Sequence, residues 1–138
     1  MKSKFVLDAC AIIAFLADEN GAEKVQDLLN LSKMENIVLY IHQINLIEIN
    51  YGIVRSDGSD IANIILSGIR KLPKKIIDKI DNKLFDNSSY FKSNYKISLA
   101  DSIALGLSKS LNAKLVTSDH HEFDVIDKNH EIEFYWIR

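Results

Sequence analysis

The feature that most constrains the fold of this chain is the alternation of short apolar runs with longer segments of helical periodicity. Runs typical of buried strands occupy residues 4–7, 38–41 and 114–117, with shorter candidates at 76–77 and 132–137. Between them the pattern predicts helices at 11–16, 22–34, 44–54, 60–71 and 98–111, one more within 78–95, and a turn or single helical turn at 118–123.

Strands that alternate with helices favour a parallel sheet, because each crossover between parallel strands is usually a helix. We therefore expect an α/β fold: three layers, α/β/α, around a central parallel sheet of four to five short strands. A chain of 138 residues, 47% hydrophobic, is long enough to bury one continuous core, which predicts a single domain over residues 1–138. In such sheets functional groups gather beyond the carboxyl ends of the strands.

The setting expected for the chain is soluble and cytoplasmic. Cys10 is the only cysteine and cannot form an intramolecular disulfide. The amino-terminal apolar run is broken by Asp8 and lacks a small-residue cleavage site. No apolar stretch approaches the roughly 20 residues needed to span a bilayer, so no membrane association is expected.

The charge pattern is ambiguous about nucleic acid. A net charge of −2 argues against phosphate binding, which usually requires a basic surface. Basic side chains nevertheless concentrate within residues 70–96: Arg70, Lys71, Lys74, Lys75, Lys79, Lys83, Lys92 and Lys96. They could form a polyanion clamp beside a cation site or simply a solvated helical face, and the sequence leaves both open.

Two acids stand at the ends of predicted strands. Asp8 directly follows the first strand, and Asp119 follows the strand at 114–117. Each has a structural alternative, since Asp is a favoured helix N-cap and also forms Asx turns. The adjacent His120 and His121 lack the spacing of a zinc site.

Glu48 lies at the margin of a predicted inward-facing stripe that includes Ile47, Tyr51 and Val54. Burying a carboxylate is unfavourable unless it is paired or bound to a cation. The structural alternative is an ion pair with Arg55.

Asp101 is the third residue after Ser98 in a capping-box pattern that opens the helix at 98–111. Capping alone is a sufficient reason for an acid there. The positive end of the helix dipole would also lower the pKa of Asp101 and keep it ionised, which suits a metal ligand.

Together the four acids indicate a metal site. Carboxylates gathered at one edge would repel one another unless a hard cation occupied the space between them. Ligation by oxygen alone selects Mg²⁺ or Mn²⁺, and such sites typically serve phosphoryl transfer.

Four segments occur in a fixed order along the chain: residues 5–10 (FVLDAC), 48–52 (EINYG), 97–104 (ISLADSIA) and 115–119 (LVTSD) followed by Phe123. This ordered set resembles the PIN-domain family, and most closely the VapC-type toxin ribonucleases of VapBC toxin–antitoxin pairs. The resemblance spans essentially the whole chain and implies a PIN fold with the acids at the carboxyl ends of the strands.

The resemblance also implies a site and partners. Asp8, Glu48, Asp101 and Asp119 would hold one or two Mg²⁺ or Mn²⁺ ions for hydrolysis of RNA, leaving 5′-phosphate and 3′-hydroxyl ends. Thr117 would support them by orienting Asp8 or a water. Transfer RNA or another structured RNA is the implied substrate, a VapB-type antitoxin the implied inhibitor, and a homodimer the implied assembly.

The chain departs from the family pattern at one place, and other classes of protein share parts of its pattern. Many relatives carry Ser or Thr within two residues of the first acid, where this chain has Ala9 and Cys10. Haloacid-dehalogenase-like phosphatases require a second Asp at the position of Cys10, and receiver domains require paired acids that are absent. A non-toxin RNA-processing nuclease, or a weakly active scaffold that binds RNA or antitoxin, remains compatible with the sequence.

Overall fold

The structure, a computed structural model, describes residues 1–138. Its elements in chain order are β1 (Ser3–Leu7), α1 (Ala9–Leu16), α2 (Ala22–Lys33), β2 (Ile37–His42), α3 (Gln43–Asp57), α4 (Ser59–Lys71), β3 (Lys75–Ile77), α5 (Asn82–Asn94), α6 (Leu99–Leu111), β4 (Lys114–Thr117), α7 (His120–Lys128) and β5 (Phe134–Trp136).

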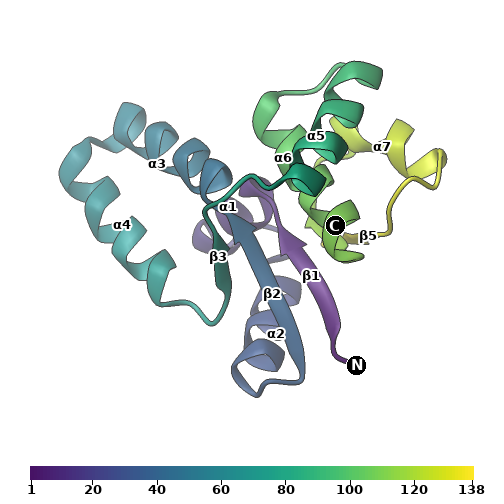
Figure 1. Ribbon diagram of the computed structural model, residues 1–138. Helices are drawn as coiled ribbons and strands as arrows, with labels where there is room; N and C mark the ends of the chain where they lie inside the picture. Colours follow the sequence, from purple (N-terminus) through teal and green to yellow (C-terminus); the bar gives the residue numbers. More distant parts are fainter.

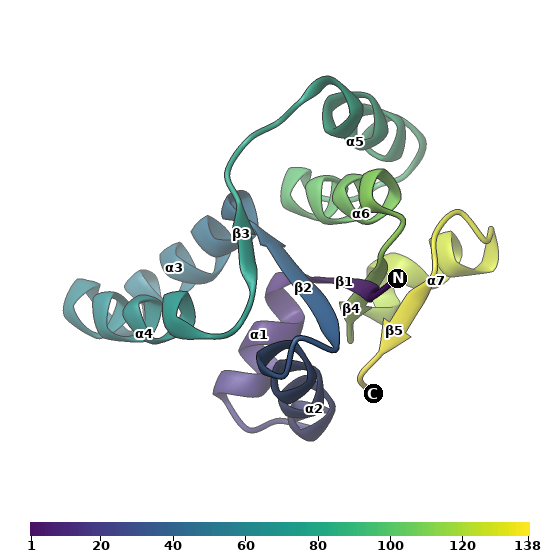
Figure 2. The same cartoon turned by 60° about the horizontal axis from the view of Figure 1, so that its bottom comes forward.

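The five strands form one sheet in the order β3-β2-β1-β4-β5. Figure 1 shows β3, β2 and β1 side by side, and all five strands are labelled in Figure 2. All neighbouring strands pair in parallel, with Val6 of β1 opposite Tyr40 of β2 on one side and Leu115 of β4 on the other. The first strand, β1, is thus the central one. β2 and β3 follow on one side of it, and β4 and β5 then form the other side. The predicted α/β fold with a central parallel sheet is confirmed.

Helices cover both faces of the sheet, which confirms the three-layer prediction. Phe5 and Leu7 of β1 point into a core shared with α1 and α2, whereas Val6 points into a core shared with α5, α6 and α7. This alternation follows from the two-residue repeat of a strand. Figure 2 shows α1 and α2 on one side of the sheet and α5 and α6 on the other.

α3 and α4 pack against each other as a hairpin that extends past the β3 edge of the sheet (Figures 1 and 2). The predicted inward stripe on α3 is wrong: Ile47, Tyr51 and Val54 are exposed. Leu46 and Ile49 are buried instead, because the core contacts the opposite side of α3. Despite this exposed apolar surface, none of the helices combines the length and apolar character that crossing a membrane requires.

The C-terminal segment differs from the prediction in two respects. Residues 118–123 were expected to form at most one helical turn, but α7 continues to Lys128. Asp119 caps this helix, and Phe123 and Ile126 anchor it in the core. The last strand, predicted at 132–137, is limited to Phe134–Trp136.

The basic segment 70–96 includes β3 and both of its flanking turns. Lys74 and Lys75 lie at the start of β3, and the Lys74 ammonium donates a hydrogen bond to the Ile69 carbonyl. Lys79 lies past the opposite end of β3, where its carbonyl oxygen is 3.0 Å from His42 Nε2. The backbone of the basic segment therefore runs from one end of β3 to the other, and the polyanion clamp stays a prediction.

α5 and α6 approach closely where Gly106 of α6 faces Ser88 of α5. A Cβ added at Gly106 would lie 2.2 Å from Ser88 Oγ, 2.8 Å from Ser88 N and 3.0 Å from Ser88 Cα. Only glycine fits here without displacing the α5 backbone.

Candidate active site

The carboxyl ends of β1 and β4 bring Asp8 and Asp119 to the same edge of the sheet. These strands are parallel neighbours, and the Asp8 N–H donates to the Val116 carbonyl oxygen over 3.3 Å. Asp8 directly follows β1, and Asp119 lies two residues beyond the end of β4. The predicted meeting of these acids at one edge follows from the parallel topology.

Asp8 is a helix cap as well as a member of this edge. Its Oδ1 accepts a hydrogen bond from the Ala11 N–H at 2.8 Å, capping α1. Only 2% of the residue is exposed, and this burial raises its pKa to about 7. Hydrogen bonds from Thr117 and Ala11 oppose the rise, and the negative charges of Asp101 and Asp119 add to it.

Asp101 enters the site from the first turn of α6. Ser98 caps this helix by accepting a hydrogen bond from the Asp101 N–H at 3.0 Å, as the capping-box pattern predicted. The expected lowering of its pKa is wrong. Burial, followed by the charge of Glu48, raises the pKa of Asp101 to about 6, outweighing both the hydrogen bond from Ser98 and the helix dipole.

Glu48 reaches the site from α3. It is partly buried, and burial together with the charge of Asp119 raises its pKa. The alternative pairing with Arg55 is absent, because the Arg55 guanidinium stacks over the Tyr51 ring, 5.0 Å from its centroid, and no ion pair in the structure involves Glu48. Nothing cationic in the protein therefore neutralises this acid.

Thr117 links two of the acids. Its hydroxyl oxygen accepts a hydrogen bond from the Asp119 N–H at 3.0 Å, and the hydroxyl also hydrogen-bonds the Asp8 carboxyl group. Thr117 is fully buried. Thr117 therefore lies between Asp8 and Asp119, and the supporting role that the family resemblance implies for it stays a prediction.

The four acids share one electrostatic environment. Each of Asp8, Glu48, Asp101 and Asp119 helps to raise the pKa of the Cys10 thiol, which burial and these charges bring to about 12. The thiol is thus protonated and a poor nucleophile at neutral pH. Cys10 therefore lies within reach of the charges of all four acids.

The chemistry of this donor set fits a hard divalent cation, because it offers only carboxylate oxygens and no neutralising Lys or Arg. As the side chains stand, no three His, Cys, Asp or Glu groups lie close enough to hold one ion. Holding a cation would require side-chain rotation that brings the carboxylates nearer to one another.

Two polar residues on the helices that follow the sheet edge were not singled out from the sequence. Glu122, in the first turn of α7, lies near enough to Asp101 to raise its pKa, and its N–H donates to Asp119 Oδ1 at 3.1 Å. Asn45, one turn before Glu48 on α3, is 0% exposed, and neither atom of its side-chain amide has a hydrogen-bond partner. The hydrophobic periodicity of the sequence gives no sign that Asn45 is buried. Glu122 could have been found from the sequence, because it is an acid three residues after Asp119.

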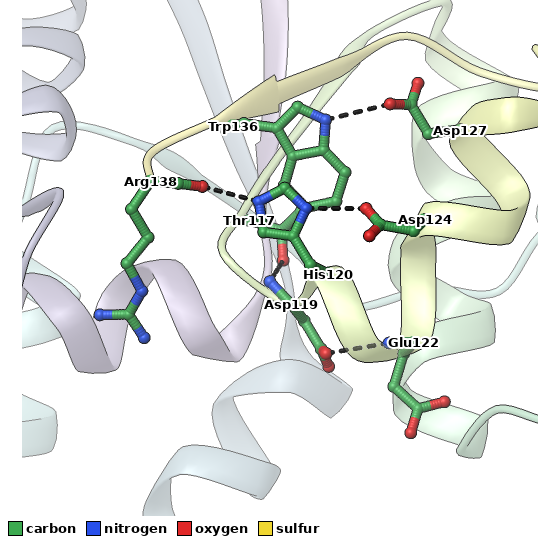
Figure 3. Close-up of polar contacts among 8 residues, drawn as sticks. All are labelled: Thr117, Asp119, His120, Glu122, Asp124, Asp127, Trp136 and Arg138. Atoms are coloured by element: carbon green, nitrogen blue, oxygen red, sulfur yellow. Dashed lines mark hydrogen bonds and ion pairs between the residues drawn. The ribbon is translucent and has the colours of Figure 1, made fainter.

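The two histidines after Asp119 have different surroundings. His120 Nδ1 is 2.7 Å from Asp124 Oδ1, and its Nε2 is 2.8 Å from the Arg138 carbonyl oxygen (Figure 3). These acceptors, the Arg138 carbonyl first, raise the pKa of His120. His121 points into solvent with its side chain 93% exposed.

Comparison with known proteins agrees with the topology. The family model described as PIN domain matches residues 5–129. No curated protein sequence matches the chain significantly. Among solved structures, VapBC2 from Rickettsia felis bound to a promoter DNA fragment matches with a TM-score of 0.75 and 20% identity over 96% of this chain and 97% of that one.

Two further structures show the same fold at similarly low identity. DNA-bound VapBC from Salmonella typhimurium matches with a TM-score of 0.76 and 18% identity, covering 99% of both chains. VapC20 from Mycobacterium tuberculosis, described as a Sarcin-Ricin loop cleaving toxin, matches with a TM-score of 0.63 and 13% identity over 89% of this chain and 95% of that one. With its strand order, its acid-bearing edge and a family match over nearly its whole length, this chain belongs to the PIN domain family.

Proposed function

We propose that this chain is a Mg²⁺- or Mn²⁺-dependent endoribonuclease, the toxin of a VapBC-type pair, acting on tRNA or another structured RNA. The observation that carries the proposal is the group of four carboxylates at one sheet edge, without a neutralising cation, in which burial raises the pKa of Asp8 to about 7 and that of Asp101 to about 6. Binding a divalent ion stabilises the ionised form of such buried, mutually repelling carboxylates.

Asp8, Glu48, Asp101 and Asp119 would hold the ion. A bound divalent ion would lower the pKa of water and offset charge on the phosphate, so that hydrolysis leaves 5′-phosphate and 3′-hydroxyl ends. Thr117 orients Asp8 through its hydroxyl. With a pKa of about 7, Asp8 can take up and release a proton near neutral pH when no cation is bound.

The partner assignments also belong to this proposal. Two of the structures that share this fold are toxin–antitoxin complexes on DNA, which supports a VapB-type antitoxin as partner. The α3–α4 hairpin exposes Ile47, Ile61 and Ile64, more apolar surface than a solvated hairpin needs. This surface is suited to contact with the antitoxin or with a second copy in a homodimer.

The test compares Asp8→Asn and Asp101→Asn with wild type in cleavage of structured RNA at saturating Mn²⁺. Cleavage should fall at least about 100-fold in each variant, since even loss of a group that only orients a metal ligand costs 10- to 100-fold. Asp81→Asn is the matched control, because Asp81 caps α5 through a hydrogen bond from the Leu84 N–H at 2.9 Å, outside the acid edge. Wild-type cleavage by both site variants would rule out the assignment.

A weakly active scaffold makes a different prediction: RNA is retained without Mn²⁺-dependent cleavage. Growth arrest on expression of the chain, relieved by co-expression of a neighbouring small open reading frame, distinguishes a toxin from an RNA-processing nuclease. Calorimetric titration with Mn²⁺ checks the site independently of cleavage, and Asp101→Asn should weaken the measured affinity.

A further inference from the structure

A flat aromatic surface lies beside Asp119, formed by the imidazole of His120 on the indole of Trp136 (Figure 3). We propose that this surface, the His120 platform, stacks an unpaired nucleobase of the RNA next to the acid edge. The inference rests on the proposed nuclease function, and it adds a binding subsite that the acids do not provide.

The platform is rigid in position and tilt. The imidazole lies parallel to the indole, with ring centroids 3.8 Å apart and an interplanar angle of 12°. Both ring nitrogens are held within the ring plane, Nδ1 by Asp124 at 2.7 Å and Nε2 by the Arg138 carbonyl at 2.8 Å. The indole is fixed in turn, because its N–H donates to Asp127 Oδ2 at 3.2 Å. A base stacking on His120 would therefore meet a surface that is already oriented.

One face of the imidazole remains free. The His120 side chain is 48% exposed, although Trp136 covers one face and hydrogen bonds engage both nitrogens. The exposed half is therefore the opposite face and the carbon edges of the ring. The contact of His120 with the end of β5 does not by itself require that one face of the ring be exposed and ordered.

The platform lies along the same edge as the acids. His120 directly follows Asp119, and Trp136 ends β5, the neighbour of β4. Neighbouring strands are about 4.8 Å apart, so the end of β5 lies roughly 10 Å from the end of β1 and from Asp8. A strand of RNA that passes its phosphate over the acids could place an adjacent base over the platform.

The ligand chemistry favours a base over a phosphate. A phosphate needs free N–H donors and a net positive environment, but both nitrogens of His120 already face acceptors, and the negative charges of Asp124 and Asp119 act on the ring. Every nucleobase has a flat π-face, and stacking on an aromatic side chain binds it without regard to sequence.

Trp136 gives a direct readout, because it is the only tryptophan of the chain. We would titrate the full chain with a single-stranded hexaribonucleotide and follow Trp136 fluorescence, with Ca²⁺ in place of Mg²⁺ and gel analysis to verify that the RNA stays intact. A hexamer of the same length and charge that lacks bases is the comparison ligand. We expect a saturable fluorescence change with the first ligand and none with the second.

Three variants test the assignment to His120. His120→Leu covers the indole but removes the aromatic face, and it should weaken hexamer binding about tenfold, the size expected for loss of one stacked base. His120→Phe restores a stacking face and should bind more tightly than His120→Leu. The matched control is His121→Leu, at the neighbouring exposed and unstacked histidine, which should bind like wild type.

Two results would overturn the proposal: an equal fluorescence change with the baseless ligand, or equal affinities for His120→Leu and His121→Leu. Because the assay involves no cleavage, its failure is distinct from failure of the nuclease assignment. If the chain binds bases but cleaves no RNA, the nuclease proposal is wrong and the proposal for the His120 platform stands. Cleavage without base-dependent binding would do the reverse.

Discussion

The acid edge of the sheet and the α5–α6 interface are both well buried, but they are built on opposite principles. At the acid edge, Asp8 and Asp101 are kept near like charges, and Asn45 is buried without a hydrogen-bond partner. At the α5–α6 interface, Gly106 lies against Ser88 with no room for one further carbon atom. Holding like charges together costs folding free energy at the first region. The second region also buries a polar atom without a hydrogen-bond partner, Ser88 Oγ, but it holds no cluster of like charges and leaves no space beside Gly106.

This difference predicts that substitutions in the two regions change the stability of the fold in opposite directions. Removing charge or polarity from the acid edge should stabilise the fold while it impairs function, as expected for a site whose arrangement serves chemistry. Adding atoms at the α5–α6 interface should destabilise the fold without touching the acids. A neutralised acid that destabilises the fold, or an added atom at the α5–α6 interface that stabilises it, would contradict this distinction.

The largest expected effect is the pH dependence of the metal-free protein. The pKa of Asp8 rises from its ordinary 3.8 to about 7 on folding, so the folded state binds a proton more tightly than the unfolded state. The contribution of Asp8 to stability is therefore complete below about pH 4 and is lost as the pH rises toward 7, by up to about 4 kcal/mol. Asp101, with a pKa of about 6, acts in the same direction.

Urea unfolding in EDTA between pH 4 and pH 8 measures this dependence, and Asp8→Asn isolates it. The variant should unfold with a flatter pH profile and should be more stable than wild type above pH 7. Saturating Mg²⁺ should flatten the wild-type profile too, because a cation favours the ionised carboxylates. Parallel profiles for wild type and variant would show that Asp8 is not destabilised by burial.

Much of the fold could be predicted because its signals are local. Strands such as 4–7 and 114–117 are short apolar runs, and their alternation with helices determines a parallel sheet. The inward face of α3 could not be predicted, since both of its sides are rich in isoleucine and only the position of the hairpin selects one. The length of α7 was underestimated because its buried residues, Phe123 and Ile126, are too few to show a period.

The positions of three acids were predictable for a related reason. Asp8 and Asp119 each cap a helix directly after a strand, and Asp101 lies in the first turn of α6, where the local pattern marks a helix start. The pKa of Asp101 was not predictable, because burial and the charge of Glu48 come from segments distant in sequence. The stacking of His120 on Trp136 likewise joins residues from different elements, and no spacing rule anticipates it.

A smaller effect is expected at the packed interface. Gly106→Ala places a carbon 2.2 Å from Ser88 Oγ and 2.8 Å from Ser88 N. Overpacking of this kind costs about 1–3 kcal/mol, and contact with backbone favours the upper end. Thermal unfolding should show a clear fall in Tm, while Mn²⁺ affinity and RNA cleavage at a permissive temperature stay unchanged.

Gly68→Ala is the matched control for this prediction. Gly68 also lies inside a helix, α4, but a Cβ there meets nothing within 4 Å. Alanine should stabilise the protein by up to about 1 kcal/mol through helix propensity alone. Equal Tm changes in the two variants would show that the interface with Ser88 tolerates a methyl group.

The smallest effect is expected at Asn45, and it tests whether the acid edge extends along α3. A buried amide without a partner costs about 1–3 kcal/mol, so Asn45→Leu, which is close in size, should raise stability by a fraction of that amount once imperfect packing is included. If the amide serves the acids, RNA cleavage should fall in the same variant although the fold is firmer. A stabilised variant with full cleavage would place Asn45 outside the site. A destabilised variant would mean that the Asn45 amide forms hydrogen bonds with water in solution.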